Sequence, residues 1–188
     1  MDPMEELEKQ VLECRNCTLC EKRTHVVFGC GNRNTDVMFV GEGPGREEDE
    51  QGIPFVGAAG RLLDDMLNAV GFSREEIYIA NVVKCRPPQN RDPFPEEQQA
   101  CIGWLRRQTA LIRPKLIVCL GRIAASAIIH EDYRITQEHG SFVERGGVKL
   151  TAIYHPAALL RNADYRAPAM EDLILIRQEA LALKAHEV

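Results

Sequence analysis

Three absences narrow the class of this protein. None of the apolar runs in its 188 residues approaches the ~18 residues that a membrane-spanning helix requires. The start, "MDPMEELEKQ", is acidic and helix-like, whereas a secretory signal needs a basic start and an apolar core. The net charge of −5 gives no general attraction to nucleic acid, so any such contact requires a local basic patch. We therefore expect a cytoplasmic protein without a membrane segment.

The glycine-rich stretch "GEGPG" (41–45) lacks the marks of a phosphate-binding loop. It has no Gly-Lys-Ser/Thr and no G-x-G-x-x-G register. Pro44 removes a backbone donor, and the acidic run at 47–50 opposes an anion. Two interpretations stay open: a tight turn that needs small residues, or a backbone that closely approaches a small neutral planar ligand.

Apolar segments alternate with helical patterns along the chain. Each apolar run is short and rich in β-branched or aromatic residues, which is typical of strands covered on both faces. Amphipathic patterns lie between and after them, and we find no repeat or linker. The alternation predicts a single domain over 1–188, with a parallel sheet between helix layers. The expected strands are 36–40, 77–83, 115–120 and 149–154, and the expected helices are 58–72, 95–112, 121–129 and 170–185.

Unusual chemistry follows the end of each expected strand. The glycine loop follows the first, the second carries Asn81 and runs into a proline-rich loop (84–95), and Gly121–Arg122 follows the third. His155 and Pro156 follow the fourth. Parallel sheets bind ligands in the crevice at the carboxyl ends of their strands. We therefore expect these motifs to meet at one site.

Three side chains suit a planar polar ligand at that site. Phe55 offers an apolar face, the Asn81 amide can donate and accept together, and His155 can donate to an oxygen that develops negative charge. Taken one at a time, Phe55 would be a core aromatic, Asn81 a strand-end cap and His155 a turn residue. Their shared position at strand ends favours the ligand site.

Seven cysteines are many for a reducing compartment, where disulfides are rare. Cys14 and Cys17 form a C-x-x-C pair, and fifteen residues separate Cys85 from Cys101. This spacing predicts a metal site, although it is too wide for a usual zinc ribbon and matches no common ferredoxin pattern. Cys20 offers a further thiolate. The remaining cysteines, Cys30 and Cys119, are expected to be small buried hydrophobes.

Three motifs together resemble the family 4 uracil-DNA glycosylases, the iron–sulfur branch of that superfamily. They are "GEGPG…EDEQGIPFVG", "NVVKCRPPQNRDPFPEEQQAC" and "HPAALLRN", in this order and spacing, and the resemblance covers nearly the whole chain. It implies a three-layer α/β/α sandwich with a central four-stranded parallel sheet. It also implies hydrolysis of the N-glycosidic bond of deoxyuridine in DNA, by a monomer, to release uracil and leave an abasic site.

The resemblance also implies roles for individual residues. The backbone of Gly41, Glu42 and Gly43 would line the uracil pocket, and Phe55 would stack on a flipped base. Asn81 would read the base edge, and His155 would lie against a uracil carbonyl. Related glycosylases of another family carry "GQDPY" here, whose Asp activates water and whose Tyr blocks thymine. Gly43 and Gly45 stand at those positions, so the catalytic candidates become His155, Glu42 and Glu48.

The same resemblance implies a [4Fe–4S] cluster held by four cysteines. Its ligands would be Cys14, Cys17, Cys85 and Cys101, which leaves Cys20 as a non-ligand. Such a cluster would tie the N-terminal segment to the loop and helix at 85–101.

Basic and apolar residues near the strand ends suit DNA. We expect four cations to contact phosphates: Lys84, Arg86, Arg91 and Arg161. We expect Leu159 to enter the base stack as a wedge. Their plain alternatives are solvated charges and, for the Leu159–Leu160 pair, packing under the loop. Two other functions also stay open. One is a protein that captures uracil and remains attached, and the other is an iron–sulfur electron carrier or structural zinc protein.

Overall fold

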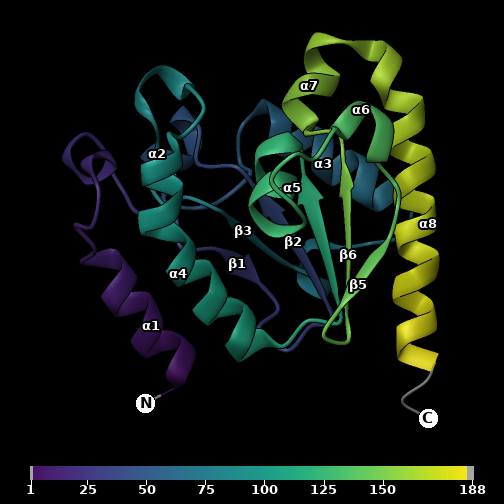
Figure 1. Cartoon of the computed structure of the whole chain (residues 1–188), viewed down its shortest axis with the longest axis horizontal. Coiled ribbons are helices and arrows are strands. Elements are labelled where there is room, and N and C mark those ends of the chain that lie inside the picture. The colour runs from purple at the N-terminus through teal and green to yellow at the C-terminus, as the bar shows by residue number, and fades with distance from the viewer. Residues whose placement is uncertain (1, 186–188) are drawn as a thin grey trace.

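The computed structural model describes residues 2–185, in which six strands form one mixed sheet (Figure 1). The strands run in the order β1-β3-β2-β4-β6-β5 across the sheet. Neighbours among β3, β2, β4 and β6 are parallel, whereas β1 and β5 pair antiparallel at the edges. The bounds are Cys30–Gly31 (β1), Val37–Gly41 (β2), Tyr78–Asn81 (β3), Leu116–Leu120 (β4), Val143–Arg145 (β5) and Val148–Ile153 (β6).

The predicted four parallel strands are present, but the prediction of a four-stranded, fully parallel sheet is wrong. The two edge strands were missed for a physical reason. β1 contains only two residues, and all three residues of β5 are exposed, so neither carries an apolar run. Short antiparallel edges therefore leave almost no hydrophobic signal.

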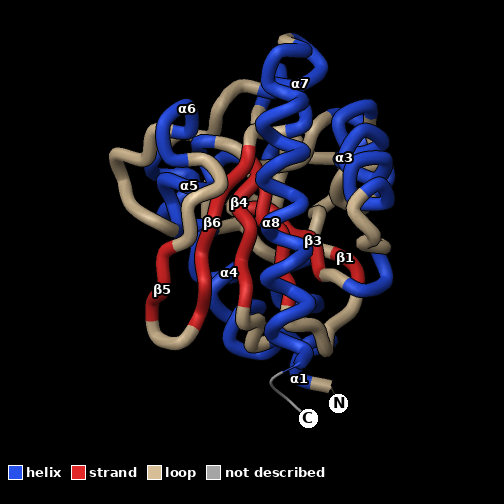
Figure 2. Tube along the Cα trace, turned by 90° about the vertical axis from the view of Figure 1, so that its right-hand side faces the viewer, coloured by secondary structure: helices blue, strands red, loops and turns tan. Residues whose placement is uncertain are grey.

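Alternate residues of the central strands face two separate cores. Met38 and Val40 point into one core, and Val37 and Phe39 point into the other. The first core is covered by α1 (Pro3–Leu12), α4 (Pro95–Ile112) and α5 (Arg122–Ile128). The second is covered by α3 (Ala58–Ala69) and α8 (Arg166–Ala185), which crosses the near face of the sheet in Figure 2. The expected helix layers on both faces are confirmed.

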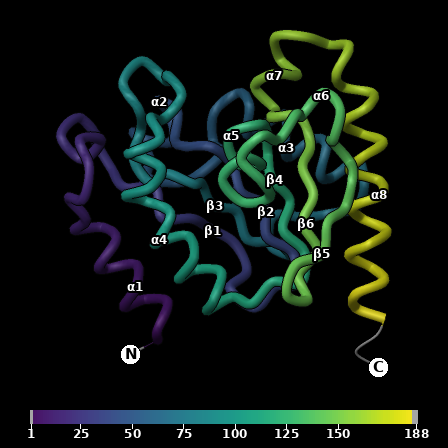
Figure 3. The backbone as a smooth tube through the Cα atoms, viewed as in Figure 1, coloured from purple at the N-terminus to yellow at the C-terminus, as the bar shows by residue number. Residues whose placement is uncertain are grey.

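Two features of the fold place the motifs. Gly41 and Asn81 are register partners at the carboxyl ends of β2 and β3, so they lie side by side. Helix α1 packs against α4, which brings the N-terminal segment beside the 85–101 region (Figure 3). Short helices lie around the strand ends: α2 (Arg46–Gln51), α6 (Ile135–Glu138) and α7 (Pro156–Arg161). Within residues 2–185, the search for a helix able to cross a membrane finds none.

Candidate active site

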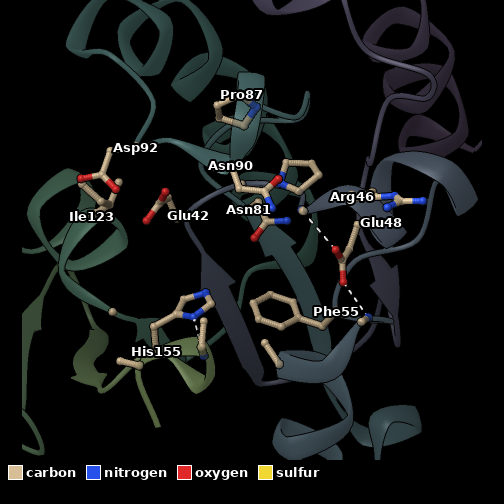
Figure 4. Close-up of a pocket in the computed structure, with 18 of the residues that line it drawn as sticks. Glu42, Arg46, Glu48, Phe55, Asn81, Pro87, Asn90, Asp92, Ile123 and His155 are labelled. Carbon is tan, nitrogen blue, oxygen red and sulfur yellow. Dashed lines mark hydrogen bonds between the residues drawn. The ribbon is translucent and has the colours of Figure 1, made fainter. Parts of the chain in front are cut away.

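A cavity of about 840 Å³ opens at the carboxyl ends of the parallel strands. All four strand-end motifs contribute to its lining, as the sequence predicted: Glu42 follows β2, Asn81 ends β3, Gly121 follows β4 and His155 follows β6. Figure 4 shows Phe55 with Asn81 on one side of its ring and His155 on another. The centroids of the Phe55 and His155 rings are 5.7 Å apart.

Gly41 permits the close packing of this group. A Cβ at position 41 would lie 2.5 Å from the Asn81 Oδ1 atom and 2.6 Å from the Phe55 Cζ atom. Real Cβ atoms do not approach heavy atoms so closely, so a side chain here would displace both residues. The first glycine of the loop is therefore needed to place an aromatic face and an amide at one point.

Asn81 carries an unsatisfied buried polar atom. The residue is 1% exposed, and its Oδ1 atom has no hydrogen-bond partner among residues 2–185. Leaving a buried acceptor unpaired costs about 1–3 kcal/mol, so such atoms are rare in native folds. A ligand with an N–H group beside the Phe55 ring would satisfy this acceptor.

His155 is held as a neutral donor. It caps the first turn of α7, where its Nδ1 atom accepts a hydrogen bond from the Ala157 N–H at 3.0 Å. Burial, with the charge of Arg161 adding to it, lowers the pKa of His155 to about 4. The imidazole is therefore neutral near pH 7, and because Nδ1 accepts, its proton lies on Nε2.

The Glu48 carboxylate accepts hydrogen bonds from the backbone around the cavity. Its Oε2 atom accepts a hydrogen bond from the Gly45 N–H at 3.1 Å. Its Oε1 atom accepts from the Val56 and Gly57 N–H groups at 2.9 and 2.8 Å. These bonds tie the start of α2 to the segment after Phe55 (dashed in Figure 4). Both oxygens of Glu48, which also lines the cavity, are therefore engaged in holding this loop.

Glu42 is the remaining candidate carboxylate. It lines the cavity and lies near Asp92 (Figure 4). Burial first, and the charge of Asp92 second, raise the pKa of Glu42 to about 7. Arg122 and Arg161 oppose that rise. The group is thus poised to change protonation near neutral pH, as general bases often are.

Two of the predicted DNA contacts are wrong. Lys84 is 1% exposed, and its Nζ atom donates to the Gln108 Oε1 atom at 2.6 Å and the Phe28 carbonyl at 3.2 Å. Its side chain therefore lies in the core and not on the exposed surface of the loop that follows β3. Leu159 is completely buried, whereas its neighbour Leu160 is 46% exposed. The exposed leucine of the pair is therefore Leu160.

The predicted arginines differ in the pairing and exposure of their guanidinium groups. Arg91 makes two hydrogen bonds of 2.8 Å to the buried Glu97 carboxylate and stacks on Phe94, so its charge is largely neutralised. Arg86 is half-buried and donates to the Asn90 Oδ1 atom at 2.7 Å. Arg161 is exposed on the cavity rim.

The sequence analysis also missed several residues that line the cavity. Arg122, Asn90 and Asp92 all line it, and Arg122 is paired with Asp92 at 2.8 Å. Arg122 directly follows Gly121 at a strand end, so the same reasoning could have found it. Asn90 and Asp92 lie in the proline-rich loop, where no periodic pattern predicts which way a side chain points.

Five cysteines line one small pocket between the N-terminal segment and α4: Cys14, Cys17, Cys20, Cys85 and Cys101. Four of their sulfurs accept N–H hydrogen bonds. The donors to Cys14, Cys85 and Cys101 are Trp104 Nε1 at 3.2 Å, Arg23 Nη1 at 3.2 Å and the Lys84 N–H at 3.3 Å. Cys17 accepts from the Leu19 N–H.

The cysteine pocket suits an iron–sulfur cluster better than a single metal ion. Over residues 2–185, no three His, Cys, Asp or Glu side chains are arranged to hold a single metal ion. A four-iron cluster differs because its thiolates bind separate corners, and N–H donors to those sulfurs are a usual second layer. Four sulfurs with donors, drawn from two distant segments, fit such a group. Of the other cysteines, Cys119 is fully buried as expected, and Cys30 is half-buried.

Comparisons with known proteins identify the family of this chain. The profile of the "Uracil DNA glycosylase superfamily" matches residues 28–176. A type-4 uracil-DNA glycosylase of Archaeoglobus fulgidus is 48% identical over 174 residues, covering 88% of this chain and 87% of the relative. One of Thermotoga maritima is 47% identical over 174 residues, covering 90% and 91%. A type-5 enzyme of Pyrobaculum aerophilum is 34% identical over 149 residues, covering 70% and 66%. The chain belongs to the uracil DNA glycosylase superfamily, and within it to the type-4 uracil-DNA glycosylases.

Proposed function

We propose that this chain excises uracil from DNA by hydrolysing the N-glycosidic bond of deoxyuridine. The observation that carries this proposal is the buried, unpartnered Asn81 Oδ1 atom beside the Phe55 ring. Uracil presents an N–H donor next to a carbonyl acceptor on one edge, and a carboxamide pairs with both. Cytosine reverses that pattern at the same edge. A flipped uracil stacked on Phe55 would thus satisfy Asn81, as base-excision enzymes require.

The bond cleavage needs stabilisation of the departing base. As the bond between the sugar C1′ and uracil N1 breaks, its electron pair leaves on the base and the sugar becomes oxocarbenium-like. His155 would donate its Nε2–H to the uracil carbonyl oxygen that gains charge, and backbone N–H groups near Gly43 would add to this. Because Nδ1 accepts from the Ala157 N–H, the neutral imidazole keeps its proton on Nε2 for this bond. Water then adds to C1′, and the proton that it releases passes through solvent to the uracil anion.

We assign the orientation of that water to Glu42. Its carboxylate is ionised only above its pKa of about 7, so the single-turnover rate should rise as pH increases through that value. His155 adds no pH dependence to the rate in this range, because its pKa of about 4 keeps it neutral throughout. Glu42→Gln should lower the rate and flatten the profile, as measured by rapid-quench assays across the neutral range.

Glu48→Gln provides the matched control. It removes a charge from the same loop but weakens the bonds to the Gly45, Val56 and Gly57 N–H groups instead of removing a base. The melting temperature should fall while the shape of the pH profile persists. A flattened profile in Glu48→Gln with an intact one in Glu42→Gln would reverse the two assignments.

We further propose that Cys14, Cys17, Cys85 and Cys101 bind a [4Fe–4S] cluster. When bound, the cluster would act as a cross-link between the N-terminal segment and residues 85–101. The sulfurs of these four cysteines accept N–H bonds, which supports them as ligands, and Cys20 is left out on the family resemblance alone. Burial raises the pKa of the Cys101 thiol to about 11, so a metal must offset the cost of the thiolate.

This ligand set makes a spectroscopic prediction. The purified protein should be brown, with about four iron and four sulfide per chain. Cys85→Ser or Cys101→Ser should bleach the visible absorbance, and Cys20→Ser should leave it intact. Loss of colour in Cys20→Ser alone would show that the wrong cysteine was excluded, and a colourless protein with stoichiometric zinc would overturn the cluster.

DNA contacts are proposed around the cavity rim. Arg161 on the cavity lining and Arg86, which precedes the lining residue Pro87, can meet phosphates. Arg122 lines the cavity at the start of α5, where a phosphate would compete with its exposed partner Asp92. Leu160 replaces Leu159 as the residue able to occupy the space left by the extruded nucleotide. We also propose that the domain acts as a cytoplasmic monomer.

One assay separates uracil excision from the alternatives. DNA with a single uracil is incubated with the protein, treated with alkali and run on a denaturing gel. An excision enzyme gives many strand breaks per protein molecule. A capturing protein gives a protein–DNA adduct, an electron carrier gives neither product, and either result would refute the proposal.

A further inference from the structure

Phe55 has an unusual backbone conformation for an aromatic residue. Its φ angle is +54°, in the left-handed region that favours glycine. Such conformations persist only where the surrounding structure over-determines them, and they cluster at functional sites. The ring of Phe55 faces the cavity beside His155 (Figure 4), so this backbone sets the direction of the base-stacking surface.

Arg74 binds the backbone of this residue from outside the cavity. Its Nη1 atom donates to the Pro54 carbonyl at 3.1 Å, and its Nη2 atom donates to the Phe55 carbonyl. Its Nε atom pairs with the Asp64 carboxylate on α3. All three guanidinium nitrogens are therefore engaged, with two on consecutive carbonyls and one on a helix. Arg74 does not line the cavity.

Helix α3 supports the same carbonyl group. A Cβ at Gly60 would lie 1.9 Å from the Phe55 carbonyl oxygen, so the helix backbone packs directly on it. Asp64 lies one turn later on that helix and anchors Arg74. The Phe55 carbonyl is thus fixed between a glycine surface and a guanidinium, while Gly41 contacts the ring on its other side.

We propose that Arg74 is a positioning residue that sets the Phe55 ring for stacking on uracil. The inference rests on the proposed role of Phe55 in base binding. The planar fork of arginine suits two neighbouring carbonyls together with a carboxylate, whereas lysine has one compact charge and can reach fewer of these partners. Without the fork, the strained φ of Phe55 relaxes and the ring loses its orientation.

Free uracil is the probe that isolates this role, because it uses the stacking face but none of the DNA contacts. The uracil inhibition constant is measured with kcat and KM on uracil-containing DNA, affinity for undamaged DNA, melting temperature and visible absorbance. Arg74→Met should raise the inhibition constant at least about tenfold, the loss that roughly 1.4 kcal/mol of stacking would give. Affinity for undamaged DNA should change less than about twofold, since no rim residue is altered.

Two further variants complete the experiment. Arg74→Lys should recover part of the uracil affinity. Arg177→Met is the matched control, because Arg177 lies over the Phe72 ring at 4.6 Å and pairs with Glu76, away from the cavity. It should lower the melting temperature without changing uracil inhibition.

Asp64→Asn keeps Arg74 but weakens its anchor by removing the carboxylate charge, and it serves if Arg74→Met does not fold. It should weaken uracil inhibition in the same direction by a smaller factor. Parental uracil inhibition in folded Arg74→Met, or in Asp64→Asn, would overturn the proposal. Failure of the parent protein to cleave uracil-containing DNA would instead refute the proposed function.

Discussion

His155→Ala should reduce the single-turnover rate of uracil excision by roughly 10²–10³-fold, which is about 3–4 kcal/mol. The lost interaction is the Nε2–H bond to the leaving base, which strengthens as negative charge develops. Its contribution therefore belongs to the transition state more than to the bound ground state. Binding to DNA with a non-cleavable deoxyuridine analogue should change far less, and rapid-quench kinetics beside binding measurements will check the difference.

The substitution also removes the helix cap of α7, and a second variant separates this effect. Loss of the acceptor for the Ala157 N–H should cost about 1 kcal/mol of stability. His155→Asn restores a favoured capping side chain but lacks a donor at the same reach. Its melting temperature should recover while its rate stays low. A folded His155→Ala protein that cleaves at close to the parental rate would eliminate the catalytic role.

Asn81→Asp should lower uracil excision on the order of 10²-fold, because it replaces a paired donor with a buried charge facing a carbonyl oxygen. In the proposed complex the parent amide would donate to uracil O4 and accept from N3–H, whereas an ionised carboxylate can only accept. The same change favours the cytosine amino group, so some excision of cytosine is expected. Parallel assays on DNA with one uracil or one cytosine opposite the same base measure both effects.

Asn68→Asp is the control for charge. Asn68 is exposed on α3, so this variant adds the same charge away from the cavity and should keep parental activity. Full uracil activity in Asn81→Asp would remove Asn81 from base recognition and leave its unpartnered oxygen unexplained.

The sequence predicted the location of the site better than the direction of its side chains. Asn81, Gly121 and His155 could be placed together because each follows a buried parallel strand, and strand ends share one edge of the sheet. The helix at 95–112 was predicted with its observed bounds, since Pro95 and two glutamates mark its start. These features depend on local periodicity, which a sequence records directly.

The errors concern long-range contacts. Lys84 was predicted at the surface because lysines usually lie there, but its charge is buried among partners from two other segments, Phe28 and Gln108. Leu159 and Leu160 are identical in type, and only the turn of α7 decides which is buried. Glu48 is held by N–H groups up to nine residues away. None of these partners follows from a local pattern.

The number of free uracil molecules released per protein molecule tests the central claim most directly. DNA carrying one uracil per duplex, in large excess over the protein, is incubated, and the small-molecule fraction is separated and quantified by chromatography. The account predicts free uracil in many-fold excess over the protein, equal in amount to the abasic sites formed. Uracil that never exceeds one molecule per protein, or strand cleavage without free base, would contradict it.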